Sequence, residues 1–343
     1  MDRRTNTINC PRCLDYRCTL PLDSAVSSSV GTSVALDGSP RDLVRSGRVR
    51  VNGGVETNCS RLVSRRDDEI SVDGRSVQLV RPRYFVCYKP RGVVCSTKRV
   101  AGIDRTDSVL ISEWLGGIRQ SCREKMNLNA KELESMKTVG RLDEESEGLL
   151  LLTNDGSFSR LLCDPAFGLQ KTYRVVARGS RYSRLLQVCG DGHRVDEDMN
   201  EQLKRHVVAL VHNGNNAAGE SAFPYESIAV LDVGKLPSQH NSDDSYYVLA
   251  DLVLREGKRH AVRRIIKNSR LRVCYLARIK VEGVRHDVPK PGTLNEASGF
   301  FDTEGRSDPT RPSVQGELEK LLGIGQLHEL TDDEVDRVFE LRS

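Results

Sequence analysis

Residues 139–162 read VGRLDEESEGLLLLTNDGSFSRLL, and this stretch decides the fold. Four consecutive leucines lie between a glycine and an Asn-Asp-Gly turn. An apolar run of this length, bounded by turn residues, predicts a strand buried on both faces. Phe158, Leu161 and Leu162 come next at helical spacing and predict a short helix packed back on that strand. Asp143 precedes the strand, where a rigid core element would hold its carboxylate in place.

Asp143 admits two interpretations. An Asp followed by Glu-Glu-Ser can cap the first turn of a short helix, and spacing alone favours this surface role. The segment Gly140 to Asp143, continued by residues 147–156, nevertheless resembles the signature of RsuA-type RNA pseudouridine synthases. In that family the Asp of this motif is the catalytic nucleophile, and Asp143 takes its position. Arg141 matches a family position that helps to hold the RNA.

Composition excludes a membrane protein and favours a polyanionic partner. Of 343 residues, 38% are hydrophobic and 29% are charged. No apolar run approaches the length of about 18 residues that a membrane helix needs. The net charge of +4 is unevenly distributed: Lys and Arg outnumber Asp and Glu in residues 41–99 and 255–290, whereas acidic residues dominate 291–343. Two basic segments predict specific surfaces that bind a polyanion.

The ten cysteines favour a reducing compartment, because most lie in apolar contexts such as FVCY, where Cys behaves as a small buried hydrophobe. Cys10, Cys13 and Cys18 could begin a zinc site, but no second CxxC or paired His lies nearby, so we expect no metal. Residues 1–35 are rich in Ser, Thr and Arg and are expected to be flexible, with some features of a transit peptide. Cytoplasm, mitochondrion and plastid all remain open.

Residues 36–80 are expected to form a small module. Gly47 ends a helix, the next residues alternate as a strand, and Asn-Gly and Asp-Gly dipeptides mark hairpin turns. The string SGRVRVNGGVE resembles the alpha-L RNA-binding domain, which often precedes RsuA-type catalytic domains. The family's first helix is not evident in residues 27–38. Arg48 and Arg50 would contact RNA from this module; a solvated basic hairpin is the alternative.

Two further motifs occur in the family's order. Residues 84–88 predict a strand, and the next turn, Lys-Pro-Arg-Gly, resembles the Lys-Pro-x-Gly turn that opens the catalytic domain; Lys89 and Arg91 are expected RNA contacts. Residues 171–177 alternate as a strand and match the family's Lys-x-Tyr-x-Val motif, whose Tyr lies against the target base. Taken alone, Tyr173 would be a core or cross-strand residue. The resemblance makes it the candidate that stacks on a flipped base and helps to remove its C5 proton.

The third motif is LREGKRHAVRRII, residues 254–266. Its apolar residues form the buried stripe of a helix, with Arg263 at the edge of that stripe. The segment resembles the family's Glu-Gly-x-x-x-Gln-Val-Arg-Arg motif, in which the first Arg pairs with the catalytic carboxylate. Arg263 takes that position and would favour the ionised form of Asp143. Ala261 stands where the family has Gln.

Three further basic side chains of this motif, Lys258, Arg259 and Arg264, are expected RNA contacts, with a solvated charged face as the alternative for each. Residues 81–343 would form the catalytic domain, with polar insertions near 190–245 and 286–315. A strand is expected within the first insertion, at Val207 to Val211. Thr331 begins a capping box that predicts a final helix.

The implied fold is α+β: a mixed, mainly antiparallel sheet flanked by helices, preceded by the small alpha-L module. The implied activity is isomerisation of a specific uridine to pseudouridine in RNA by base flipping and nucleophilic attack of Asp143 at C1′ or C6. The reaction requires no cofactor. We expect RNA, ribosomal RNA first, to be the partner of a monomeric protein. The alternatives are a non-catalytic RNA-binding or ribosome-assembly protein of the same fold, and a zinc-dependent module built on the N-terminal cysteines.

Overall fold

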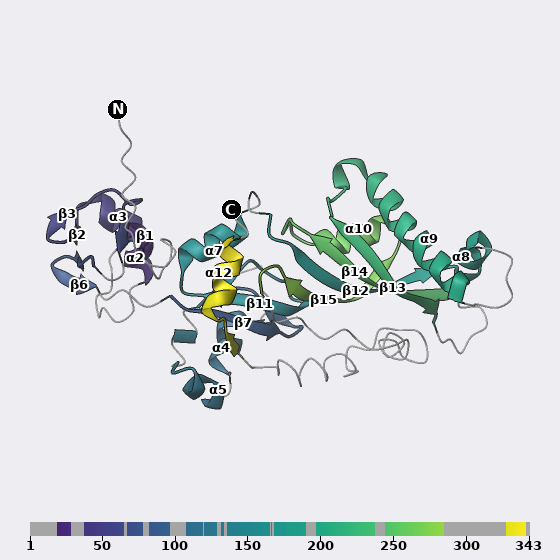
Figure 1. Ribbon diagram of the computed structural model, residues 1–343, viewed down its shortest axis with the longest axis horizontal. Coiled ribbons are helices and arrows are strands. Elements are labelled where there is room, and N and C mark those ends of the chain that lie inside the picture. Colours follow the sequence, from purple (N-terminus) through teal and green to yellow (C-terminus); the bar gives the residue numbers. More distant parts are fainter. Residues whose placement is uncertain are drawn as a thin grey trace. The chain divides into compact units, whose positions relative to one another are not determined.

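The computed structural model describes residues 19–28, 38–64, 67–77, 82–96, 108–118, 120–128, 132–133, 136–164, 166, 168–189, 197–236, 244–284 and 327–340. The chain divides into two compact units, residues 1–84 with 152–162 and residues 85–151 with 163–343 (Figure 1). The predicted second insertion and the three N-terminal cysteines lie outside the described residues. Within the described ranges, no helix combines the length and apolar character needed to cross a membrane.

The first unit contains a small sheet with the strand order β3-β2-β5-β6. Its strands are β2 (Val49–Val51), β3 (Gly54–Val55), β5 (Ile70–Val72) and β6 (Arg75–Val77). The helix α3 (Pro40–Arg45) precedes β2 in the sequence. Both predicted hairpin turns are confirmed, because Asn52 and Asp73 have φ values of +52° and +51° and each precedes a Gly of positive φ. Such paired left-handed residues match the twist of the flanking strands.

The module begins earlier than the sequence predicted. β1 (Thr19–Pro21) pairs antiparallel with β4 (Leu62–Ser64), and α2 (Leu22–Ser28) comes directly after β1. Leu22 and Val26 are buried in the same core cluster as Leu43 and Val49. The expectation of a flexible segment through residue 35 is therefore corrected for residues 19–28, where apolar side chains at helical spacing complete the module's core.

The second unit is built on one mixed sheet with the strand order β13-β14-β12-β15-β11-β7-β16, and β10 (Lys137–Val139) pairs with β11. The strands are β7 (Tyr84–Lys89), β11 (Glu147–Thr153), β12 (Lys171–Ser180), β13 (Ser227–Lys235), β14 (Ser245–Leu254), β15 (Arg272–Val281) and β16 (Leu327–Glu329). β11 and β15 are parallel, whereas β13–β14, β14–β12, β12–β15 and β16–β7 are antiparallel. The predicted α+β fold with a mixed, mainly antiparallel sheet is confirmed.

The leucine-rich stretch forms β11, and every one of its residues is buried, as predicted. Gly148 has φ +114°, and a Cβ added there would lie 2.2 Å from the carbonyl oxygen of Arg278 on β15. No side chain fits at that distance, so the parallel pairing of these strands requires glycine at this position. The predicted helix after the turn is α7 (Gly156–Cys163), whose Phe158 ring lies 4.6 Å from the ring of Tyr84.

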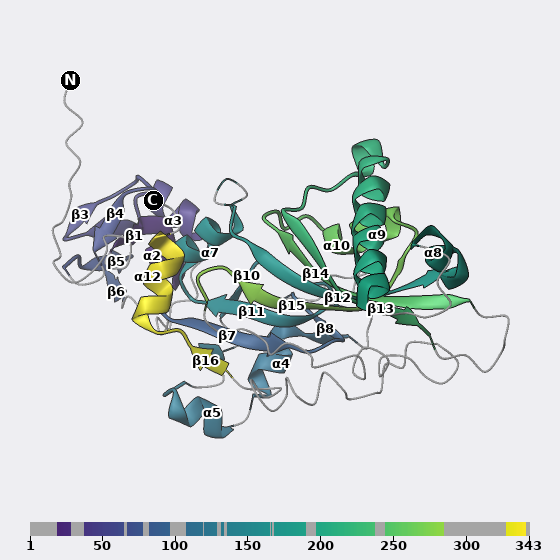
Figure 2. The ribbon, with the colours of Figure 1, turned by 45° about the vertical axis from the view of Figure 1, so that its right-hand side comes forward.

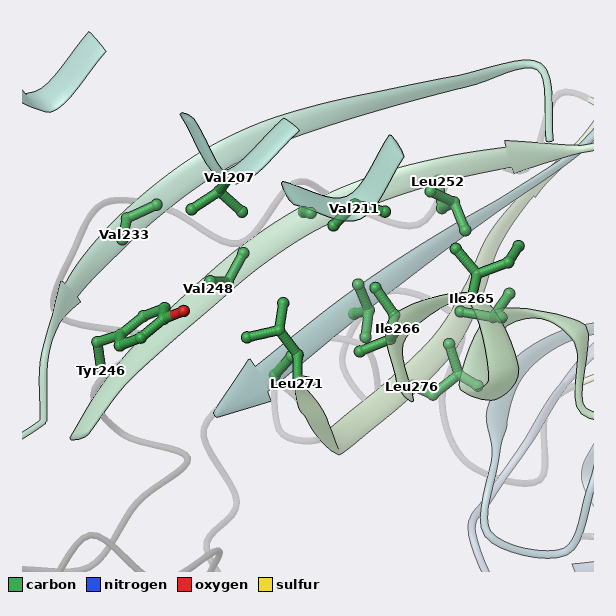
Figure 3. Packing of buried hydrophobic residues seen from close by; sticks show 14 of the residues in the cluster. Val207, Val211, Val233, Tyr246, Val248, Leu252, Ile265, Ile266, Leu271 and Leu276 are labelled. Atoms are coloured by element: carbon green, nitrogen blue, oxygen red, sulfur yellow. The ribbon is translucent and has the colours of Figure 1, made fainter. Parts of the chain in front are cut away.

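One face of the sheet is covered by helices. α9 (Glu197–Asn216) packs on β13 and α10 (Ala261–Asn268), while α8 (Tyr182–Cys189) packs against α9 (Figure 2). We call the buried cluster between these helices and the sheet the helix-side core (Figure 3). It includes Val175, Leu203, Val207, Val211, Val233, Tyr246, Val248, Leu252, Ile265, Ile266, Leu271 and Leu276.

The predicted strand at Val207 to Val211 is wrong, because these residues belong to α9. Met199, Leu203, Val207 and Val211 recur every four residues and are buried along one side of the helix. This is the period of a helical stripe, which outweighs the strand preference of the individual valines. Part of the expected polar insertion is therefore an ordered layer of the second unit.

Smaller elements complete the second unit. β8 (Val93–Val94) pairs in parallel with β9 (Val109–Leu110), which leads into α4 (Ile111–Gly116) and then α5 (Gln120–Lys125). The 3-10 turn η2 (Gly219–Ser221) comes after α9. The predicted final helix is α12 (Asp332–Glu340), and its capping box is confirmed: the Glu334 amide donates to Thr331 Oγ1 over 3.3 Å, and the Thr331 amide donates to Glu334 Oε2 over 2.9 Å.

Candidate functional site

Asp143 lies in the loop between β10 and β11. Gly140, with φ +72°, turns the chain out of β10, and the amide of Ser146 donates to the carbonyl of Asp143 over 3.0 Å. The next residue, Glu147, already belongs to the buried strand. The Asp143 side chain is 31% exposed. A tight turn against a buried strand thus holds a carboxylate that solvent and a ligand can still reach.

The Lys-Pro-Arg-Gly turn contacts this loop. The amide of Gly92 donates to the carbonyl of Glu144 over 2.8 Å, which joins the Lys-Pro-Arg-Gly turn to the loop of Asp143. Arg91 in that turn and Arg141 in the loop are both exposed. Segments about fifty residues apart in sequence are therefore held together by a backbone hydrogen bond, and each carries an exposed arginine.

Arg263 does not make the contact that the sequence predicted. Its guanidinium lies 3.6 Å from the carboxylate of Glu145, and it donates to the Glu145 carbonyl over 3.1 Å and to Ser146 Oγ over 3.3 Å. The expected ion pair of Arg263 with Asp143 is therefore corrected. Arg263 reaches the loop from the first turn of α10 and contacts the backbone carbonyl of Glu145 and the side-chain hydroxyl of Ser146, two and three residues after Asp143.

The partner of Asp143 within the described part of the chain is His260. Its Nε2 lies 3.5 Å from Asp143 Oδ1. His260 directly precedes α10 and has left-handed backbone angles, φ +59° and ψ +21°. Sequence reasoning missed this residue. The available signal was its place in the third motif, one helical turn before Arg263, since α10 brings residues 260 and 263 to one side.

Lys89 is also placed differently from the prediction. Its side chain is fully buried, and its ammonium donates to the carbonyls of Pro90 and Val93 over 2.9 and 2.7 Å. The expected RNA contact of Lys89 is therefore corrected, because a buried ammonium cannot reach phosphate. Burial lowers the pKa of Lys89 to about 8, and the nearby carboxylates of Glu147 and Asp143 partly oppose this shift.

Tyr173 lies on β12 and is partly buried against the helix-side core. Across β15 it stands in register with Arg278, which in turn pairs with Gly148 of β11. A register irregularity between Thr172 and Tyr173 interrupts the ladder at this point. The three strands thus bring the Tyr of the second motif into line with the strand that comes after Asp143.

A buried polar cluster on β11 was not predicted. The phenols of Tyr88 and Tyr275 both donate to Oε1 of Glu147. Burial is the main cause that raises the pKa of each phenol, and the Glu147 carboxylate adds to the shift. Both phenols therefore remain protonated donors at neutral pH. They satisfy a carboxylate that would be costly to bury alone and link β7, β11 and β15 beneath the loop.

The other basic candidates of the third motif are exposed. Lys258 pairs with Glu256 over 2.7 Å, Arg259 donates from Nε to His260 Nε2 over 3.3 Å, and the Arg264 guanidinium lies 4.4 Å from the Phe223 ring centroid. Exposed charges held in position are suited to binding phosphate.

In the first unit, Arg48 pairs with Asp73 through two nitrogens, which lowers the pKa of that carboxyl, and Arg50 donates to the Gly53 carbonyl. Within the described ranges, no group of three or more potential metal ligands comes together.

The chain is similar to proteins that modify RNA. A model of the RNA pseudouridylate synthase family matches residues 83–268. Ribosomal large subunit pseudouridine synthase B of Bacillus subtilis is 31% identical over 169 residues, covering 49% of this chain and 61% of that protein. A putative chloroplastic ribosomal large subunit pseudouridine synthase, SVR1 of Arabidopsis thaliana, is 29% identical over 256 residues, covering 74% of this chain and 52% of that protein. The chain thus spans less than two thirds of the length of both relatives.

Among solved structures, a crystal structure of pseudouridylate synthase aligns with 93% of this chain and 99% of that chain at 20% identity, with a TM-score of 0.41. An agreement of this size adds nothing to the match of the family model.

Proposed function

The chain belongs to the RNA pseudouridylate synthase family, and we propose that it converts a specific uridine of ribosomal RNA into pseudouridine. The observation that carries this proposal is the placement of Asp143. Its carboxylate is accessible, its loop is clamped by Gly92 and Arg263, and His260 lies 3.5 Å from it. A protein that only bound RNA would gain nothing from an anchored carboxylate beside a polyanion.

The reaction conserves atoms and electrons. The bond between C1′ and N1 breaks, a bond between C1′ and C5 forms, the C5 proton leaves, and N1 gains a proton. Attack of Asp143 at C1′ and addition at C6 both begin with an ionised carboxylate. Two cations lie near the loop: Lys89, which is buried and interacts electrostatically with Asp143, and Arg263, which pairs with Glu145 over 3.6 Å.

The uridine must leave its stack before Asp143 can reach it. Extrusion costs a few kcal/mol of stacking and pairing, which an aromatic face at the site can partly replace. We assign this role to Tyr173, because it is partly exposed and in register, through β15, with the strand that comes after Asp143. Its phenol is also the proposed aid to removal of the C5 proton.

The motifs that meet at the proposed site also carry exposed cations, to which we assign RNA contacts. Arg91 and Arg141 come from the loops, and Lys258, Arg259 and Arg264 come from the segment at α10. In this proposal residues 81–343 form the catalytic domain, and the basic module of the first unit adds RNA contacts through Arg48 and Arg50. Ribosomal RNA is the proposed substrate because both relatives carry ribosomal subunit pseudouridine synthase in their names.

The test is tritium release from ribosomal RNA labelled at uridine C5. We expect release by the wild-type chain, and a loss on the order of 10³-fold or more for Asp143→Asn, because the amide cannot act as a nucleophile. Asp164→Asn is the matched control, since Asp164 is exposed and caps only the Ala166 amide. If the wild-type chain bound both precursor and mature ribosomal RNA tightly but released no tritium from either, the proposal would be contradicted and the non-catalytic RNA-binding alternative favoured.

A further inference from the structure

One nitrogen in the site faces two incompatible partners. His260 Nε2 lies 3.5 Å from Asp143 Oδ1 and 3.3 Å from Nε of Arg259. A guanidinium can only donate a hydrogen bond, and an ionised carboxylate can only accept one. Nε2 can accept a hydrogen bond from Arg259 only when it carries a lone pair, and it can donate one to Asp143 only when it carries a proton. The two contacts therefore belong to alternative states of the imidazole.

The surroundings allow the imidazole to exchange between these states. His260 is 44% exposed, so solvent can carry a proton from Nδ1 to Nε2 without changing the net charge of the ring. Its left-handed backbone is rare for a residue with a Cβ and persists only where the structure imposes it. The side chain is thereby held between the loop of Asp143 and the segment of Arg259.

Among the cations around this pair, Arg259 has the contact that an anion would displace most easily. Arg263, one helical turn onward, is engaged by Glu145 and Ser146, and Lys89 is fixed beneath the loop by backbone carbonyls. Lys258 pairs with Glu256. Arg259 is exposed, and its hydrogen bond to His260 is a long one. A phosphate would compete for its guanidinium strongly, because charge-assisted bonds to an anion are stronger than a bond to a neutral imidazole.

We propose that His260 is a positioning residue that couples RNA contact at Arg259 to the orientation of Asp143. When phosphate takes the guanidinium, Nε2 is released, accepts a proton and donates it as a hydrogen bond to Asp143 Oδ1. The carboxylate is then fixed in one rotamer only when RNA is present. The link to catalysis rests on the proposed function, whereas the exchange of hydrogen bonds does not.

The kinetic test is single-turnover tritium release from the same labelled RNA at saturating protein. We expect His260→Ala to slow the step about 10- to 100-fold, as a misplaced catalytic group does, while the Kd for RNA stays within error of wild type. His260→Gln should recover most of the rate, because its amide can both accept from Arg259 and donate to Asp143. Lys267→Ala, an exposed change on the same helix, is the control. A wild-type rate in His260→Ala, or no recovery in His260→Gln, would overturn the proposal.

A second measurement reads the hydrogen bonds without any catalysis. Side-chain ¹⁵N NMR of the full chain distinguishes a protonated Nε2 from one with a lone pair. We expect Nε2 of His260 to become protonated when an oligouridylate is added, and also in Arg259→Ala without RNA. That protonation should be lost when Asp143→Ala is added to Arg259→Ala, because alanine offers Nε2–H no acceptor. A His260 signal insensitive to all three changes overturns the coupling. A responsive signal in a chain that releases no tritium supports the coupling and refutes only the proposed function.

Discussion

Arg263 contacts the loop of Asp143 without touching the Asp143 carboxylate. Its guanidinium spans the Glu145 carbonyl, the Glu145 carboxylate and Ser146 Oγ. These contacts hold the loop from α10, while the Gly92 amide holds it from the other motif. A catalytic group displaced by as little as 1 Å can lose much of its rate. We therefore expect the position of Asp143 to depend on the planar guanidinium that makes these three contacts together.

Arg263→Lys tests the clamp. Lysine keeps the charge but offers one ammonium in place of a planar fork, so it cannot make the three contacts together. We expect single-turnover pseudouridine formation to fall about 10- to 100-fold with little change in thermal stability. Lys267→Arg, at the exposed end of the same helix, should leave the rate unchanged. Equal rates for Arg263→Lys and wild type would show that the positive charge alone suffices.

Lys89 makes stability depend on pH in a defined direction. Burial lowers the pKa of Lys89 to about 8, so at higher pH the folded chain lacks a proton that an unfolded lysine retains until about pH 10. The unfolded state then binds more protons, and the free energy of unfolding rises with pH through this window. Below about pH 8 both states carry the proton, and the penalty for burying the charge is constant.

The variant Lys89→Met should remove this rise. We expect the free energy of unfolding of wild type, minus that of Lys89→Met, to increase by on the order of 1–3 kcal/mol between about pH 8 and pH 10. Denaturant unfolding at several pH values measures the difference. Lys267→Met, at an exposed position, should show no such trend. A flat difference for Lys89→Met would mean that its ammonium is better solvated than its burial indicates.

At the scale of elements, α9 lies in a region expected to be a polar insertion and packs as part of the fold. The helix packs on β13 and on α10, and its buried stripe joins the helix-side core (Figure 3). Since α10 carries Arg263 and begins directly after His260, the support for the site reaches into a region whose polar composition suggested loops. The period-four stripe was present in the sequence, but the neighbouring Gly, Asn and Ser residues obscured it.

Leu203→Ala tests this layer. Leu203 is fully buried on α9, and truncating such a side chain costs about 2–5 kcal/mol through lost burial and the cavity left behind. We expect a loss of this size in chemical denaturation. Arg205→Ala, an exposed change on the same helix, should stay within about 0.5 kcal/mol of wild type. A negligible effect of Leu203→Ala would show that α9 is not part of the cooperative unit.

At the scale of the whole molecule, both units carry arginines that the proposed function assigns to RNA binding. In the first unit, Arg48 is oriented by Asp73 and Arg50 by the Gly53 carbonyl. In the second, Arg91, Arg141 and Arg259 are exposed, and Arg141 belongs to the loop of Asp143. A polyanion that bound both sets would release counterions from each, so affinity should depend steeply on salt.

The paired change Arg48→Ala/Arg50→Ala tests the contribution of the first unit. We expect the Kd for ribosomal RNA to rise and the slope of log K against log salt to become shallower by about 1 to 2, because up to two phosphate contacts are lost. The single-turnover rate at saturating protein should persist. Arg337→Ala, in the acidic helix α12, serves as the control. An unchanged salt slope in the paired variant would remove the module from the RNA surface.

Local chemistry was enough for the sequence to predict the leucine-rich strand, the hairpin turns and the motif order. The leucine run favours a buried strand, the Asn-Gly and Asp-Gly pairs favour tight hairpins, and Thr331 caps the helix that begins at the next residue. These features depend on neighbours within a few residues. The position of Asp143 before a buried strand could likewise be predicted from neighbouring residues.

Only the tertiary structure decided what each charged side chain of the site touches. Lys89 and Arg91 are two residues apart in one turn, yet one is buried against carbonyls and the other is exposed. His260, and not Arg263, lies beside Asp143 because the left-handed residue before α10 redirects the chain. Burial and ion pairing are set by elements that are distant in sequence and pack together. Differences of a few ångströms decide which charged groups make contact, and no local sequence pattern determines them.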